Sequence, residues 1–231
     1  MIARIGGDRF KVIRGRGRPD PSSFPPLPPE FNGWIYLDSE APDRLHYFNY
    51  MGERVPFCGN ATRVVGYLLL GGRDGETHVL ASGPKRVRVR GEWVGIELPV
   101  RAALRADHAV MRMEGVEHFV MPVRNVLAYH LKALYDSVEK AGLRYHINIY
   151  EPVGDAIFVR TWEYGHPREA LGCATGTLSS AAHFIITKGM HRVRTRVLSG
   201  DEGVVSGDGE IFILWNRLRL DGVLEPLAPP H

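Results

Sequence analysis

The sequence contains no glutamine, and among its 231 residues it has only two cysteines, six asparagines and five lysines. A chain of this length with two cysteines is not a small disulfide-held scaffold, and zinc sites built from CxxC pairs are excluded. The shortage of thermolabile glutamine and asparagine favours a source that grows at high temperature. Cys58 and Cys173 therefore each have to be accounted for singly.

A large charge surplus and a long apolar run are also missing. The chain has 29 Lys and Arg against 26 Asp and Glu, a net charge of +3. This balance argues against a protein whose main task is to neutralise phosphates. The most apolar stretch, residues 64–70, is far shorter than the roughly 20 residues that cross a bilayer. Charged side chains interrupt residues 1–11, so no signal peptide is expected there. We expect a cytoplasmic protein that binds neither nucleic acid nor membranes.

Hydrophobic residues make up 44% of the chain, enough to form a core. Helices are expected at residues 64–70, at residues 125–140 and after Cys173, and the proline-rich residues 18–30 are expected to form a surface loop. Short segments rich in aromatic and β-branched residues predict strands. These strands cover residues 3–13, 34–37, 45–48, 77–81, 85–90, 93–100, 109–113, 117–123, 145–150, 156–162, 192–198, 203–206 and 210–215. The sequence therefore predicts an α+β fold.

The two cysteines are separated by half of the chain, and their surroundings are alike. Each follows a strand-rich segment and precedes a small, polar turn and an apolar helix, in the windows Cys58-Gly-Asn-Ala-Thr and Cys173-Ala-Thr-Gly-Thr. We interpret this as an internal duplication. It predicts two pseudo-symmetric β-rich domains, each wrapping a central helix, at residues 1–107 and 108–231, with the final residues returning to the first domain as an alternative. The active site is expected in the interdomain cleft.

A cysteine at a helix start is suited to a specific kind of chemistry. The first backbone N–H groups of a helix have no intrahelical partner, so they can stabilise a thiolate or hold a carboxylate. The helix end lowers a thiol pKa from about 8.5, which makes the cysteine a usable base. Two such cysteines on opposite sides of a carbon can remove one proton and return another to the other face. This pattern indicates inversion of a stereocentre without a cofactor.

The cysteines are also compatible with two simpler roles. A lone cysteine in a cytosolic domain is commonly an inert, buried apolar side chain. A redox disulfide between the pair is the third possibility, and we expect it only as an inactivating side reaction.

The sequence around both cysteines resembles the diaminopimelate epimerase family, enzymes that use two cysteines and no pyridoxal cofactor. The first family motif is matched by Phe48-Asn49, Gly52 and Cys58-Gly59-Asn60-Ala61-Thr62-Arg63. The second is matched by Trp162-Glu163-Tyr164-Gly165 and Gly172-Cys173-Ala174-Thr175-Gly176. Weaker similarities at residues 113–118, 146–148 and 207–215 extend the resemblance over nearly the whole chain.

The resemblance implies a role for each matched residue. Cys58 and Cys173 would be the acid/base pair, and the N–H groups of Gly59, Asn60, Ala174 and Thr175 would hold the carboxylate of the inverted centre. Glu163 would bind its ammonium group, and Asn49, Asn148 and Tyr164 would line the remainder of the substrate site. A homodimer is a further implication of the family.

Three departures from the family pattern concern the distal end of diaminopimelate. The chain has Gly6-Gly7-Asp8 in place of the family's Gly-Asn-Asp, Val116 in place of an asparagine, and Tyr164 in place of an arginine. Tyrosine has neither the charge nor the fork geometry that lets arginine bind a second carboxylate. The reaction type is therefore expected to be kept and the substrate side chain to differ.

The leading hypothesis is an isomerase, a cofactor-independent amino-acid racemase or epimerase that acts on a small-molecule amino-acid substrate by a thiolate/thiol mechanism. One alternative is a related isomerase that moves a proton or double bond in a carboxylate substrate, and another is a non-catalytic metabolite-binding relative. The ten histidines have no metal-ligand spacing, so we expect no metal site. His118 and Arg63 are expected to make structural contacts at least as often as substrate contacts.

Overall fold

The computed structural model describes residues 1–20, 22 and 24–224, and these form two compact units. The first unit comprises residues 1–96 and 217–224, and the second comprises residues 97–216. The chain passes from one unit to the other within two strands, β8 (Trp93–Pro99) and β16 (Ile211–Asp221). The described residues are mostly strand, with three α-helices, so the predicted α+β class is confirmed.

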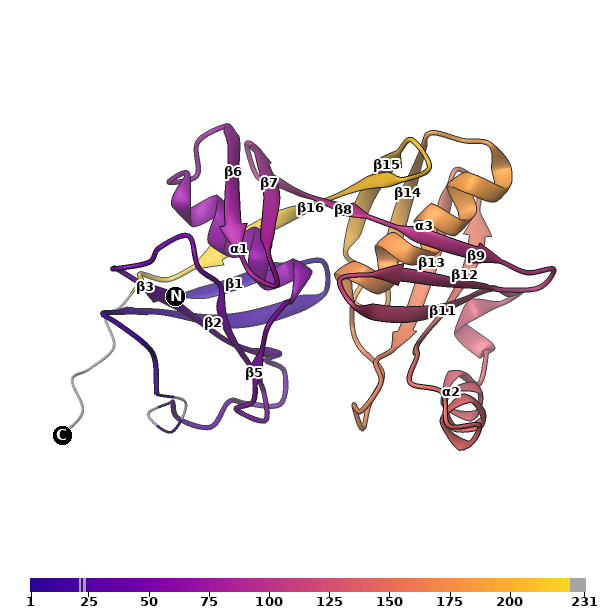
Figure 1. Ribbon diagram of the computed structural model, residues 1–231, viewed down its shortest axis with the longest axis horizontal. Helices are drawn as coiled ribbons and strands as arrows, with labels where there is room; N and C mark the ends of the chain where they lie inside the picture. The colour runs from indigo at the N-terminus through magenta and orange to yellow at the C-terminus, as the bar shows by residue number, and fades with distance from the viewer. Residues whose placement is uncertain (21, 23, 225–231) are drawn as a thin grey trace. The chain divides into compact units, whose positions relative to one another are not determined.

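The first unit surrounds one helix with two groups of strands (Figure 1). Helix α1 packs against β6 and β7 on one side and against β1 and β3 on the other. The sheet order is β5-β4-β3-β2-β1 followed by the last part of β16, and β6, β7 and β8 form a meander whose last strand, β8, also pairs with β16. The element bounds are β1 (Ile2–Ile5), β2 (Asp8–Gly15), β3 (Gly33–Asp38), β4 (His46–Asn49), β5 (Arg54–Val55), α1 (Gly59–Leu69), β6 (Gly75–Leu80) and β7 (Pro84–Arg90).

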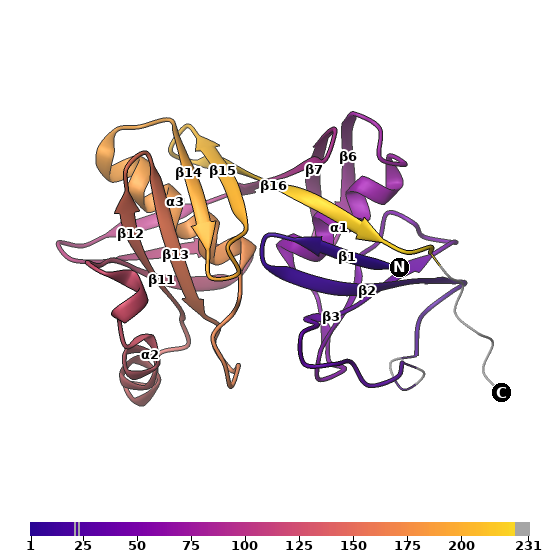
Figure 2. The same cartoon turned by 180° about the vertical axis from the view of Figure 1, so that it is seen from behind.

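The second unit places helix α3 against a sheet that extends from β10 to β15 (Figure 2). The order is the first part of β16 followed by β15-β14-β13-β12-β11-β10-β9. The element bounds are β9 (Arg101–Leu104), β10 (Ala109–Met113), β11 (Val116–Pro122), η2 (Val126–Ala128), α2 (Leu131–Lys140), β12 (His146–Val153), β13 (Ala156–Trp162), α3 (Ala174–Lys188), β14 (Arg192–Val197) and β15 (Glu202–Gly207).

Local signals explain where the predicted elements hold and where they do not. The expected strand at residues 3–13 is a hairpin, because Gly6 and Gly7 take positive φ values of 57° and 93° that suit a tight turn between β1 and β2. The helix expected at residues 125–140 is interrupted. Asn125 takes a left-handed conformation and starts the short 3-10 helix η2, and Tyr129 is extended before α2 begins. Strand β9 was not predicted.

In each unit a β-hairpin is followed along the chain by a strand that pairs in parallel with the second strand of the hairpin. The connector between the hairpin and this parallel strand covers an outer face of the sheet. In the first unit the connector is the proline-rich segment, as predicted, and its Phe24 packs against Trp34, Tyr36 and Phe48. In the second unit the connector contains α2, whose Tyr135 stacks on Trp162. The opposite faces of the same strands contact α1 and α3.

The helices of the described residues are short relative to the thickness of a bilayer. None of them has both the length and the apolar character that a membrane-spanning helix needs.

Candidate active-site residues

Cys58 occupies the N-cap of helix α1. Its backbone is extended, with φ −144° and ψ 116°, and its carbonyl accepts the first helical hydrogen bond from Thr62 N at 2.8 Å. The N–H groups of Gly59 and Asn60 precede that bond, so they belong to the unsatisfied donors of a helix start. The sulfur therefore lies at the positive end of a largely buried helix.

Cys173 occupies the same place in helix α3. Its φ and ψ are −137° and 121°, and its carbonyl accepts from Thr177 N at 2.8 Å. Gly176 N donates to its sulfur at 3.4 Å, and the Thr175 hydroxyl lies 3.4 Å from the same atom. The expected helix-start position is thus found for both cysteines, with nearly identical backbone geometry.

A buried polar network supports the helix start that carries Cys58. Asn60 donates from Nδ2 to Asp8 Oδ2 at 2.7 Å, and its Oδ1 accepts from Arg63. Arg63 is fully buried, and burial lowers its pKa to about 9, although the charges of Asp8 and Cys58 oppose that change. The same attraction acts in reverse, so the Arg63 cation favours negative charge on the Cys58 sulfur. Arg63 is therefore a structural residue with an electrostatic effect on Cys58.

Cys173 has the opposite electrostatic surroundings. Burial raises the pKa of its thiol well above the usual value, and the charge and hydrogen bond of Glu163 raise it further. The Thr175 hydroxyl and the Gly176 N–H lower it less. At Cys173, desolvation and a neighbouring carboxylate therefore oppose the helix dipole, and both favour the protonated thiol.

Glu163 lies among titratable side chains of the second unit. His166 Nε2 is 3.6 Å from its Oε2, and its charge also acts on His146. His146 is the register partner of His118 across the parallel strands β11 and β12, with ring centroids 5.0 Å apart. Burial lowers the pKa of both His118 and His146, so both imidazoles are neutral at pH 7. Among the described residues, no group of three or more His, Cys, Asp or Glu side chains is placed to hold a metal ion.

Asn148 and Asn49 are engaged in the protein's own contacts. Asn148 is fully buried, donates to the carbonyls of Phe119 and His146 at 3.2 and 3.0 Å, and accepts from the Thr161 hydroxyl at 2.9 Å. Asn49 accepts from two backbone N–H groups of its own turn and donates to Glu53 at 2.9 Å. Both side chains act structurally in this conformation. Asn148 still adjoins the first turn of α3, because a Cβ at Gly176 would collide with its Oδ1.

The remaining expected residues differ in accessibility. Tyr164 is 37% exposed, and its backbone N–H donates to His146 Nδ1 at 2.7 Å. Ala174 is buried and Thr175 is half-buried at the start of α3. Within the second unit the structure therefore brings Glu163 and Thr175 to the Cys173 sulfur, whereas the backbone of Tyr164 contacts His146.

Asp8 and His146 were missed as neighbours of the candidate site. Asp8 is 52 positions from Asn60 in sequence, and His146 reaches Glu163 and His118 only through sheet pairing. Asp8 carried a signal, since it lies in the N-terminal segment compared with the family motif. His146 carried none beyond its position two residues before Asn148.

Known proteins resemble the chain over most of its length. No family model matches it. The diaminopimelate epimerase of Thermotoga maritima is 29% identical over 187 residues, which covers 73% of this chain and 75% of that protein. The diaminopimelate epimerase of Methanopyrus kandleri is 26% identical over 194 residues, covering 79% of this chain and 69% of that protein.

Solved structures share the fold at low sequence identity. A phenazine biosynthesis protein of the PhzF family from Enterococcus faecalis has a TM-score of 0.71 at 12% identity, covering 96% of this chain and 95% of that one. A predicted epimerase from Pseudomonas aeruginosa has a TM-score of 0.69 at 17% identity, covering 96% of each chain. The sequence relatives confirm that the chain resembles the diaminopimelate epimerase family over most of its length.

Proposed function

We propose that the protein is a cofactor-independent amino-acid racemase or epimerase that inverts a Cα centre with Cys58 and Cys173. The observation that carries this proposal is the matched placement of both cysteines at helix N-caps, with the same extended backbone geometry. The names of its sequence relatives support the epimerase class.

The proposed reaction is a two-base proton exchange. The Cys58 thiolate takes the α-proton, and the electron pair of the broken C–H bond moves into the substrate carboxylate. The Cys173 thiol then gives its proton to the opposite face, which leaves Cys58 as a thiol and Cys173 as a thiolate. Reaction in the other direction exchanges the two roles. The mechanism requires both sulfur atoms to reach one Cα.

Electrostatics support this assignment of roles. Arg63 favours negative charge on Cys58, whereas burial and Glu163 keep Cys173 protonated. The dianion formed on deprotonation would be held by the N–H groups of Gly59 and Asn60 and of Ala174 and Thr175. Glu163 would bind the substrate ammonium group.

The substrate side chain is proposed to be uncharged at its distal end. Tyr164 and Val116 replace polar family residues, and the nearby His118 and His146 are neutral because burial lowers the pKa of each. Neutral imidazoles do not replace the charge of the missing arginine, so they would not bind a second carboxylate as that arginine does.

The sequence repeats are proposed as two copies of one pseudo-symmetric domain, divided near residue 107. Each contains a hairpin, a covering connector, a parallel strand, an antiparallel strand and the cysteine-bearing helix, in that order. The compact units differ from these repeats in two segments. Residues 97–107 of the first repeat belong to the second unit, and residues 217–224 of the second repeat belong to the first unit.

Deuterium incorporation tests the proposed function. Reduced protein in D₂O is incubated with a panel of L- and D-amino acids that includes diaminopimelate, and Cα exchange is followed by NMR. Exchange with a neutral amino acid, lost in Cys58→Ala and in Cys173→Ala, is expected. Absence of exchange with every member of the panel would refute the racemase.

The unequal electrostatic surroundings of the two cysteines favour a second candidate, an isomerase that moves a proton or double bond in a carboxylate substrate. Such a reaction needs one acid/base group only, so the two cysteine variants would then lose activity to very different extents.

A further inference from the structure

The first unit has a groove of about 480 Å³ that shares no lining residue with the Cys58 site. Its lining consists of two arginines and four apolar residues: Arg44, Leu45, Arg54, Pro56, Leu80 and Ala81. No acidic side chain contributes to this lining. The groove therefore combines two positive charges with an apolar lining.

The two arginines have no ion-pair partner within the part of the chain that the structure describes. Across the described part of the chain, neither the Arg44 nor the Arg54 guanidinium has an ion pair or hydrogen bond. Other arginines differ, since Arg16 and Arg112 each contact a glutamate. Free guanidinium forks are suited to bidentate binding of an oxyanion.

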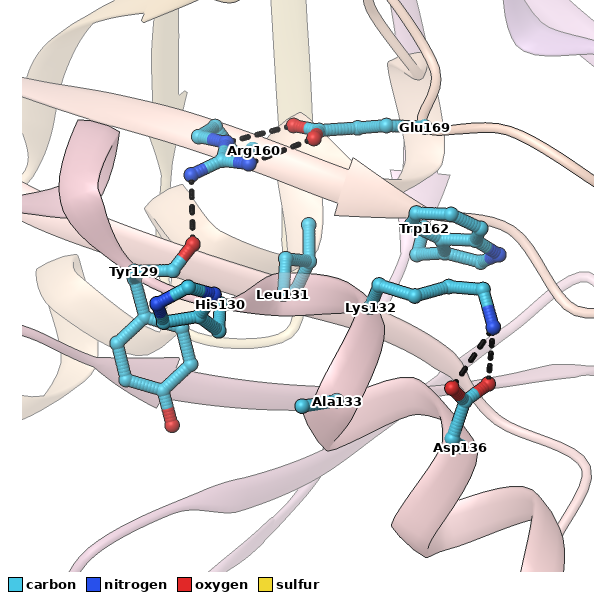
Figure 3. A pocket seen from close by; sticks show the side chains of 9 residues that line it. All are labelled: Tyr129, His130, Leu131, Lys132, Ala133, Asp136, Arg160, Trp162 and Glu169. Carbon is cyan, nitrogen blue, oxygen red and sulfur yellow. Dashed lines mark hydrogen bonds and ion pairs between the residues drawn. The ribbon is translucent and has the colours of Figure 1, made fainter.

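The pocket beside α2 is the useful contrast (Figure 3). It has a similar volume, about 440 Å³, and it also contains basic side chains. There, however, Arg160 donates twice to Glu169 at 2.7 Å, and Lys132 contacts both oxygens of Asp136 at 2.5 and 2.7 Å. Its cations are satisfied internally, so they offer nothing to an anion.

A buried histidine, His46, lies near the arginine groove. His46 lies on the same sheet face as Arg54, because Arg54 pairs with Phe48 in the antiparallel register and His46 is two residues from Phe48. His46 is 4% exposed, and its Nε2 has no hydrogen-bond partner among the residues that the structure describes. A buried polar atom without a partner is unfavourable.

The charges around His46 are mainly positive. Burial lowers its pKa most, and the charges of Arg54, Arg44 and Arg18 lower it further, while Asp38 opposes them. The Tyr36 ring packs edge-on against the imidazole with centroids 6.0 Å apart. Three guanidinium groups are thus close enough to act on one buried ring.

We propose that Arg44 and Arg54, with His46 buried near them, form a binding site for the phosphate group of a small phosphorylated metabolite. Two guanidinium charges match a phosphate dianion better than a single carboxylate. The organic part of the ligand contacts the apolar lining of the groove, which consists of Leu45, Pro56, Leu80 and Ala81. A nearly balanced total charge of +3 does not favour a nucleic-acid backbone as the source of the phosphate.

Calorimetric titration with inorganic phosphate tests this site, with malonate as the carboxylate probe and sodium chloride keeping the ionic strength constant. Saturable phosphate binding, tighter than malonate binding, is expected. Arg44→Ala and Arg54→Ala should each weaken it by about tenfold or more, which corresponds to about 1.4 kcal/mol. Arg14→Ala is the matched control, since it removes the same charge from an exposed position of the same unit.

Two results would overturn the site: no saturable phosphate binding, or an equal loss in Arg14→Ala. Malonate binding as tight as phosphate would overturn the assignment to phosphate. The Cα exchange assay separates this inference from the proposed function, because the arginine variants should exchange deuterium at the unaltered rate.

Discussion

The two units present a cysteine in the same way but support it with opposite charges. In the first unit, Asp8, Asn60 and the buried cation of Arg63 lie beneath the helix start. In the second unit, the carboxylate of Glu163 adjoins the cysteine. A common backbone geometry therefore does not impose a common electrostatic environment, since different charges lie near the two sulfur atoms.

The units also cover equivalent sheet faces by different means. The first places Phe24 of a proline-rich segment on an aromatic cluster, and the second places the amphipathic helix α2 on an apolar cluster that includes Leu131 and Tyr135. Proline fixes an extended backbone that lies flat on a sheet, whereas a helix has to supply a periodic apolar stripe. The requirement in both cases is burial, and two local structures meet it.

Removal of either cysteine should have the largest effect. Cys58→Ala and Cys173→Ala are each expected to lower racemisation by about a thousandfold, within the range of general acid–base catalysis. Polarimetry or chiral chromatography measures the rate. A variant that keeps more than a tenth of the activity would break the two-base scheme.

Loss of the buried cation should mainly affect stability. Arg63→Met leaves Asp8 buried without its charge partner and is expected to lower the free energy of unfolding by about 3–5 kcal/mol. Urea denaturation measures this. Arg14→Met is the control for charge removal at an exposed position of the same unit. Equal stability of the two variants would show that Arg63 is not structural.

Substitution of one helix glycine in each unit allows the packing around α1 and α3 to be compared directly. A Cβ at Gly66 of α1 would meet Val87, and one at Gly176 of α3 would meet Asn148 and Thr161. Each glycine-to-alanine change is expected to cost about 1–3 kcal/mol by overpacking, despite better helix propensity. Thermal unfolding measures both. Gly176→Ala should also reduce activity, because its contacts are beside Cys173, and Gly66→Ala serves as its control.

Thiol reactivity should reveal the charge asymmetry. Cys58 is expected to react with iodoacetamide at neutral pH about tenfold faster than Cys173, because only the thiolate is nucleophilic. Mass spectrometry of peptides gives both rates in one sample. Glu163→Gln should speed alkylation of Cys173 by removing the charge that raises its thiol pKa. Unchanged Cys173 reactivity in that variant would contradict the assigned role of Glu163.

The smallest effect concerns stability at high pH. The Cys173 thiol keeps its proton in the folded state to a higher pH than in the unfolded chain. Above the unfolded thiol pKa of about 8.5, unfolding then releases a proton, so stability falls as pH rises toward the native pKa. Comparison of the wild type with Cys173→Ala by urea denaturation at pH 7.5 and 10 isolates this contribution. The fall should be shallower in the variant.

Prediction from sequence succeeded where the signal was local. The helix starts at both cysteines, the proline-rich cover and most strands follow from residue type and spacing. It failed at residues 125–140, where the left-handed Asn125 and the extended Tyr129 interrupt a helical pattern. The dipole of α3 could be inferred from sequence, whereas the desolvation and the Glu163 carboxylate that raise the pKa of the Cys173 thiol could not.

The sequence by itself determined the α+β class, the two cysteine-bearing helix starts and the resemblance to diaminopimelate epimerases, because propensity, turn chemistry and short motifs act over a few residues. Tertiary structure alone decided that Asn60 joins Asp8 to Arg63, that His118 pairs with His146, and that Arg44 and Arg54 share a groove. These contacts depend on strand register and burial, which join residues far apart in the chain and set the local electrostatic field.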